Sequence, residues 1–138
     1  MISCIFCKII NGEIPCTKVY EDANVFGFLD SKPVNPGHTL VIPKKHYENI
    51  HETPDELLGK MAIVAKKIAD AILKLGAKGI NIGMNNGAIA GQSVFHAHIH
   101  VMPRYGKDNF SLWVGKEYDG NEREEIAEKI RASFRAES

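Results

Sequence analysis

The segment GQSVFHAHIHVMPR, residues 91–104, decides how the rest of the chain is interpreted. Within it, His96, His98 and His100 alternate with apolar residues. Because successive side chains of a β-strand point to opposite faces, this alternation predicts a strand from residue 93 to residue 102. In such a strand all three imidazoles line one surface, and the apolar side chains line the other.

Three interpretations can be weighed for this histidine face. A polar surface that happens to contain histidine explains strict alternation beside a glycine-rich loop poorly. A metal site formed by all three conflicts with distance. At a rise of ~3.3 Å per residue, His96 and His100 are ~13 Å apart, whereas zinc–nitrogen bonds measure only ~2.0–2.1 Å. Nucleophilic catalysis remains, because a neutral imidazole with a pKa of ~6.5 attacks acyl and phosphoryl centres.

The residues before the histidines fit a phosphoryl substrate. Residues 87–93 form a glycine-rich loop that ends in Gln92 and Ser93. Backbone N–H groups of such a loop, together with a hydroxyl and an amide, can hold the oxygens of a phosphate group. An anionic substrate is therefore expected at this loop.

The composition is that of an ordinary globular protein without a general affinity for polyanions. The 138 residues include 17 Lys and Arg and 17 Asp and Glu, so the formal net charge is zero. This length predicts a single domain, and the charge balance argues against a nucleic-acid or membrane-surface partner. No apolar run approaches the ~20 residues of a membrane span. The N-terminus lacks a secretory signal pattern, so a cytoplasmic location is expected.

Apolar periodicity and turn residues predict an α+β fold. Short connections favour a mainly antiparallel sheet of about five strands with helices packed on it. Thr53, Pro54 and Glu56 predict a capping box at the start of a long helix. The expected helices are 4–11, 54–75 and 122–135, and the expected strands besides 93–102 are 17–20, 25–29, 38–43 and 79–85.

Two of the three cysteines form the pair Cys4-x-x-Cys7. In a reducing compartment this pair predicts metal ligands or a redox pair more readily than a disulfide scaffold. The redox interpretation lacks the thioredoxin-like βαβ setting that it needs. The residues alone leave open whether the pair binds a metal or is simply two buried thiols in an amphipathic helix.

The sequence resembles the histidine triad family, and within it the Hint-like branch and its zinc-binding bacterial and archaeal members. Residues 96–102 fit the signature His-φ-His-φ-His-φ-φ without departure. The resemblance implies a single histidine triad domain over 1–138, with a core at about 4–105 and a C-terminal extension at 106–138. Besides the signature, it covers residues 4–15, 19–30, 37–46 and 91–94, together with Asn85.

The resemblance implies a nucleotide-binding hydrolase or transferase that cleaves nucleotide conjugates, such as nucleoside phosphoramidates, at the α-phosphorus. His98 is implied as the nucleophile that forms a nucleotidyl-histidine intermediate. His100, His38 and Ser93 are implied to hold phosphate oxygens or the leaving group. For a purine nucleotide or nucleotide conjugate, the implied contacts are Phe6, Ile9 and Phe28 at the base, Asp30 at the ribose hydroxyls, and Asn85, Gly91, Gln92 and Ser93 near the ribose and phosphate.

The same resemblance implies a structural zinc ion held by Cys4, Cys7, His46 and His96, which is a closed tetrahedral ligand set. Cys16 lies outside the family pattern and is left as a small side chain without a role. The resemblance also implies a homodimer in which the sheet continues across two chains.

Three other functions stay open at this point. The first is a dinucleoside polyphosphate hydrolase of the same family, which shares the chemistry and differs in the leaving group. The second is a nucleotide-binding adaptor whose activity is incidental; a complete triad with Ser93 favours turnover instead. The third is a zinc hydrolase, which needs an open metal position that four protein ligands would close.

Overall fold

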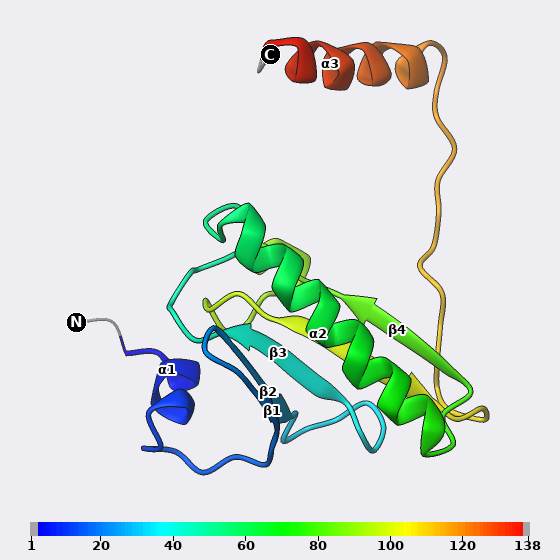
Figure 1. The fold of residues 1–138 in the computed structure, drawn as a ribbon. Helices are drawn as coiled ribbons and strands as arrows, with labels where there is room; N and C mark the ends of the chain where they lie inside the picture. Colours follow the sequence, from blue (N-terminus) through cyan, green and yellow to red (C-terminus); the bar gives the residue numbers. More distant parts are fainter. Residues whose placement is uncertain (1–2, 137–138) are drawn as a thin grey trace. The chain divides into compact units, whose positions relative to one another are not determined.

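Five β-strands form one antiparallel sheet in the order β1-β2-β3-β5-β4 (Figure 1). The computed structural model describes residues 3–136 of the chain. The sheet confirms the predicted α+β class, and it leaves β1 and β4 at the two edges. The strands are β1 (Lys18–Glu21), β2 (Val25–Leu29), β3 (Thr39–Pro43), β4 (Gly79–Gly83) and β5 (Ile99–Arg104).

Helices cover both faces of this sheet. The long helix α2 (Asp55–Lys74) lies across one face (Figure 1). Its apolar side chains pack on Val25, Val41, Ile99 and Val101. Phe6 of the short helix α1 (Ile5–Ile10) packs with Phe26, Phe28, Leu40 and Ile42. All five residues of β3 are therefore buried.

The two faces of β5 explain where the last two histidines of the triad point. Ile99 and Val101 pack on α2. Because neighbouring strand residues point to opposite faces, His98 and His100 lie on the α1 side. The edge-to-face contact of the His98 ring with Phe6, 5.2 Å between ring centroids, agrees with this placement.

The predicted strand over 93–102 is wrong in its first half, because β5 begins only at Ile99. The chain bends at residues 94–96, and His96 and Ala97 are both fully buried. The backbone N–H of Ala97 donates to the Tyr47 carbonyl at 2.7 Å. That contact holds the bend and separates His96 from the regular strand.

The long helix matches the predicted span of 54–75 to within one residue at each end, but its predicted capping box is wrong. The residue before its first turn is Pro54, which offers no side-chain cap. The Thr53 hydroxyl donates instead to the carbonyl of Asn49 at 2.8 Å. Its oxygen is therefore engaged in closing the preceding turn and does not cap the helix.

The chain divides into a compact unit that ends at Asp108 and a second unit that starts at Asn109. The second unit contains α3 (Glu122–Ala136), which matches the predicted terminal helix. Within α3, Glu128 pairs with Arg131 at 3.2 Å and with Arg135 at 2.6 Å. No helix in residues 3–136 has the length and apolar character that crossing a membrane requires.

Candidate active site and metal centre

His98 is held in one orientation and one protonation form. Its Nδ1 lies 2.7 Å from the carbonyl oxygen of His96, and only 5% of the residue is exposed. Because a carbonyl can only accept, Nδ1 carries the proton and Nε2 keeps its lone pair. The bend before β5 thus supplies the acceptor that leaves His98 Nε2 with its lone pair.

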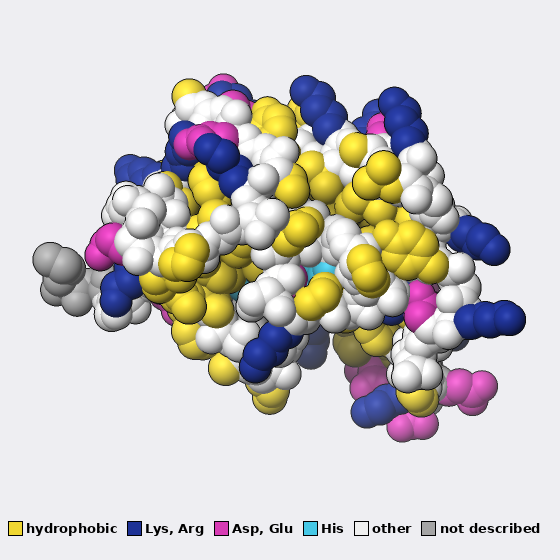
Figure 2. All heavy atoms as spheres, turned by 90° about the horizontal axis from the view of Figure 1, so that it is seen from below, with side chains coloured by type: hydrophobic (Ala, Val, Ile, Leu, Met, Phe, Trp, Pro, Cys, Tyr) yellow, Lys and Arg dark blue, Asp and Glu magenta, His cyan; other side chains and the backbone are white. Residues whose placement is uncertain are grey.

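The His98 side chain faces a cavity of about 590 Å³ between α1 and the sheet. In Figure 2 a histidine side chain is visible, recessed among hydrophobic ones. The volume is of the size that small-molecule sites occupy. The predicted site residues that line it are Phe6, Ile9, Phe28, Asp30, Ser93, His98 and His100.

A series of hydrogen bonds determines which ring nitrogen carries the proton in His38 and in His100. The Val34 backbone N–H donates to His38 Nδ1 at 3.0 Å, so His38 Nε2 carries the proton. That proton points to His100 Nδ1, also at 3.0 Å. His100 must then carry its own proton on Nε2, where it can be donated to a substrate oxygen.

The same hydrogen bonds argue against a metal ion at these side chains. Asp30, His38 and His100 lie close enough together to hold an ion, with Asp30 Oδ2 3.6 Å from His38 Nε2. His38 has no lone pair to offer, however, because its Nδ1 accepts from Val34 and its Nε2 is protonated. We therefore interpret His38 and His100 as ordered hydrogen-bond donors, with the Asp30 carboxylate beside them as an acceptor.

Burial keeps the imidazoles of this site neutral. It lowers the pKa of His38 and of His98, although the nearby Asp30 carboxylate opposes this in both cases. For His100, burial acts together with the neighbouring histidines and lowers the pKa to about 4. At neutral pH the site therefore presents neutral imidazoles, and an unprotonated imidazole is the form that can act as a nucleophile.

The glycine-rich loop is braced by the side chain of Gln92, which is 3% exposed. Its amide oxygen accepts from the Gly87 N–H at 2.9 Å, and its amide nitrogen donates to the carbonyls of Glu48 and Val94. Within the loop, a short 3-10 turn, η1 (Ala88–Ala90), ends at Gly91, whose φ of 95° favours glycine. Of the residues predicted for catalysis and nucleotide binding, four do not line the cavity: His38, Asn85, Gly91 and Gln92.

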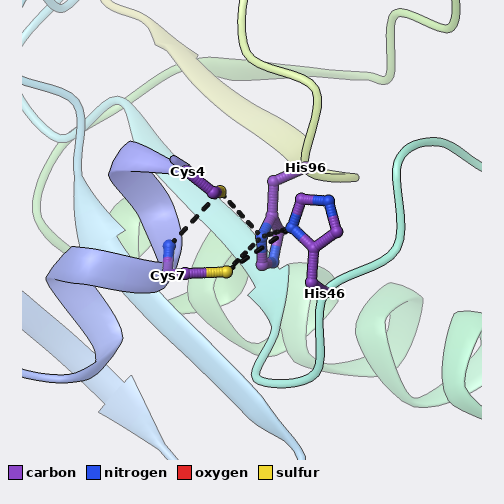
Figure 3. A group of neighbouring side chains, drawn as sticks. All are labelled: Cys4, Cys7, His46 and His96. Atoms are coloured by element: carbon purple, nitrogen blue, oxygen red, sulfur yellow. Dashed lines mark hydrogen bonds between the residues drawn. The ribbon is translucent and has the colours of Figure 1, made fainter. Parts of the chain in front are cut away.

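A second cluster joins α1 to the loop before β5. Figure 3 shows Cys4 and Cys7 of α1's first turns directed at His46 and His96. Cys4 Sγ lies 3.4 Å from His96 Nδ1, Cys7 Sγ lies 3.5 Å from His46 Nδ1, and the two Nδ1 atoms are 3.1 Å apart. All four ligand atoms lie within 4.8 Å of one another. A zinc ion bound tetrahedrally, with bonds of ~2.3 Å to sulfur and ~2.0–2.1 Å to nitrogen, fits among ligand atoms at these separations.

The donor chemistry of the cluster also fits zinc. The Nε2 of His96 donates to the Pro43 carbonyl at 2.8 Å, so its Nδ1 lone pair faces the two sulfurs. Burial, followed by the adjacent Cys4 thiol, raises the pKa of Cys7 to about 11. A bound cation supplies the positive charge that would ionise this thiol.

The cavity has polar lining residues that the sequence did not reveal. Cys16, Thr17 and Ser31 line it, and the Cys16 thiol is free and exposed. Cys16 follows α1 by several residues and belongs to no motif. Its position in the wall arises from the turn that connects α1 to β1, which no spacing rule would have indicated.

Fold and histidine geometry together place the chain in a known class. It belongs to the HIT domain family, whose match covers residues 11–107. It is 49% identical over 128 residues to an uncharacterized HIT-like protein of Methanocaldococcus jannaschii, covering 93% of this chain and 98% of that one.

Two relatives have named activities. The adenosine 5′-monophosphoramidase of Schizosaccharomyces pombe is 44% identical over 114 residues, or 83% of each chain. The adenylylsulfatase of Arabidopsis thaliana is 46% identical over 114 residues, 82% of this chain but only 57% of that protein.

Solved structures agree with the fold. A HIT family member from Bacillus subtilis superposes with a TM-score of 0.87 at 47% identity, covering 95% of this chain and 96% of that one. A zinc-bound histidine triad family protein from Mycobacterium smegmatis has a TM-score of 0.76 at 40% identity, covering 99% and 98% of the two chains.

Proposed function

We propose that this protein hydrolyses nucleotide conjugates at the α-phosphorus, with His98 as the nucleophile. The observation that carries the proposal is the hydrogen bond from His98 Nδ1 to the His96 carbonyl, which leaves Nε2 with its lone pair beside the cavity. A neutral imidazole held in this way attacks phosphorus without first losing a proton.

The reaction takes place in two displacements. His98 Nε2 forms a bond to the α-phosphorus while the bond to the leaving group breaks, and the leaving group takes that electron pair. An amine leaving group also takes up a proton from water. Water then attacks the nucleotidyl-histidine, the nitrogen–phosphorus bond breaks back to Nε2, and the proton from water passes to solvent. His100 Nε2–H and the Ser93 hydroxyl donate to phosphoryl oxygens as charge builds on them.

The remaining cavity residues bind the nucleotide. Phe6, Ile9 and Phe28 contact the base, since they belong to the apolar part of the lining. The Asp30 carboxylate accepts from the ribose hydroxyls. His38 acts on His100 through its hydrogen bond, and Asn85, Gly91 and Gln92 shape the phosphate loop. The HIT domain core extends over about residues 4–105, and residues 106–138 are an extension.

The relatives support this class of reaction, because one is named for cleaving a phosphoramidate and another for cleaving an adenylyl sulfate. A substrate panel tests it directly. We expect turnover of adenosine 5′-phosphoramidate, with release of AMP, at a rate above that of diadenosine tetraphosphate. Faster cleavage of the dinucleotide would favour the polyphosphate hydrolase, and no turnover of either would favour a binding protein.

We also propose that Cys4, Cys7, His46 and His96 hold a structural zinc ion. When bound, the ion supplies a tetrahedral cross-link and no open coordination position. The four ligands join α1, which carries Phe6 of the cavity wall, to the segment that precedes His98. The cross-link therefore fixes the two sides of the nucleotide cavity relative to each other.

Nucleotide binding predicts protection of Cys16. Its exposed thiol lines the cavity, so a bound nucleotide would cover it. At AMP concentrations ten times the dissociation constant, alkylation of Cys16 by iodoacetamide should slow about tenfold. Mass spectrometry of the Cys16 peptide measures this, with Cys16→Ser as the unlabelled control. An alkylation rate that AMP leaves unchanged would contradict the assignment of the cavity.

A homodimer formed along β4 is a further part of the proposal. β4 is an edge strand, and its Ile82 side chain is 52% exposed, which is typical of an edge that another chain covers. We expect Ile82→Lys to convert a dimer to a monomer in light scattering. The matched variant at the other edge, Val19→Lys in β1, should remain dimeric. Dissociation by Val19→Lys alone would assign the interface to β1.

A further inference from the structure

A second cavity lies next to the nucleotide cavity. Its volume is about 520 Å³, far more than one metal ion requires. Ile5, Ile14, Ser93 and Val94 line both cavities, so the two share a wall that contains Ser93. A substrate with its phosphorus at His98 therefore has space for one further substituent beyond Ser93.

The two cavities differ in charge. The nucleotide cavity contains the carboxylate of Asp30. The second cavity is lined by Lys8 and by no acidic side chain of the described residues. Within residues 3–136, none of the ion pairs involves Lys8. Cys4 and His46 of the proposed zinc site also line this cavity. A zinc ion held by two thiolates and two neutral imidazoles would add no net charge, so Lys8 sets the sign of this cavity.

We propose that the second cavity receives the leaving group and that Lys8 makes the protein selective for nucleotide conjugates with an anionic leaving group, such as sulfate. The inference rests on the proposed function and specifies its substrate class. Lys8 is a half-buried residue of α1 and lines the second cavity. Partial exclusion of water strengthens its attraction for an anion.

The way the leaving group departs explains why the charge of Lys8 matters in the second cavity. When His98 Nε2 bonds to phosphorus, the phosphorus–oxygen bond to sulfate breaks and its electron pair stays on the sulfate oxygen. Sulfate then leaves as a dianion and needs no proton, whereas an amine leaving group must acquire one. Lys8 stabilises the negative charge that grows on sulfate during this step. It offers no such help to the release of ammonia.

The test compares kcat/KM for adenosine 5′-phosphosulfate with kcat/KM for adenosine 5′-phosphoramidate. We expect Lys8→Met to lower the ratio of sulfate to amidate turnover about tenfold. Lys8→Arg keeps the charge and should restore most of the ratio. The matched control is Lys67→Met on α2, where the lysine is exposed and lines neither cavity. It should leave the ratio unchanged.

Two results separate the failure of this inference from failure of the proposed function. An unchanged ratio in Lys8→Met, with both substrates turned over, overturns the role of Lys8 alone. If the wild type cleaves neither substrate, the proposed hydrolase is wrong. Calorimetry then still tests the second cavity. Lys8→Met should weaken the binding of adenosine 5′-(α,β-methylene)diphosphate about tenfold more than it weakens the binding of AMP. If Lys8→Met weakens the binding of both nucleotides equally, or changes neither affinity, the anion subsite is rejected.

Discussion

Replacement of His98 by asparagine should lower turnover of adenosine 5′-phosphoramidate by at least ~10³-fold, because no other group can take over the covalent step. Asparagine is chosen because its side-chain N–H₂ can still donate to the His96 carbonyl, as His98 Nδ1 does. The variant therefore removes the nucleophile and retains the local hydrogen bond. Steady-state release of AMP measures the effect.

His51→Asn is the matched control for this variant. His51 is exposed and lies outside both cavities, so the same substitution there should leave turnover unchanged. AMP binding and the melting temperature of His98→Asn should stay near those of the wild type. Turnover within tenfold of the wild type would reject His98 as the nucleophile, whatever the binding data show.

Loss of the zinc cross-link should cause the largest change in stability. A ligand that binds only the folded state adds about 4 kcal/mol to the free energy of unfolding when its free concentration is a thousand times its dissociation constant. Cys7→Ser removes one of the four ligands and should lower the melting temperature accordingly. Elemental analysis should find about one zinc per wild-type chain, as a closed four-ligand site requires.

The chain provides its own control for the zinc prediction. Cys16→Ser makes the same substitution at a cysteine outside the cluster and should keep both the zinc and the melting temperature. A chelator should destabilise the wild type and Cys16→Ser, but not Cys7→Ser. A well-folded wild-type protein that contains no zinc and does not respond to chelator would refute the structural ion.

The histidine pattern located the side chains that line the cavity but not the backbone that orients them. Alternation correctly assigned His98 and His100 to one face. It also extended the strand back to residue 93, whereas β5 begins at Ile99. The error has a physical cause. The alternation shows only which residues are polar, whereas the bend is held by a hydrogen bond from Ala97 to the Tyr47 carbonyl, which lies far away in the sequence. The hydrogen bond from His98 Nδ1 to the His96 carbonyl depends on that bend.

Long-range contacts limited the other predictions. The place of Gln92 beside the phosphate stays a prediction. Its amide is engaged with Gly87, Glu48 and Val94, and only the folded chain brings Glu48 there. The spacing of Cys4 and Cys7 indicated two ligands. The remaining two, His46 and His96, came from family resemblance, because no spacing rule connects residues so far apart in sequence. The four do lie together.

The covalent intermediate provides the most direct test of the central claim. The wild type is mixed with adenosine 5′-phosphoramidate, quenched within the first turnover under conditions that preserve phosphoramidate bonds, and analysed as intact protein and as peptides. The account predicts a transient adenylyl adduct on His98 that is absent from His98→Asn. Full turnover with no adduct at any time, or with an adduct on another residue, would contradict it.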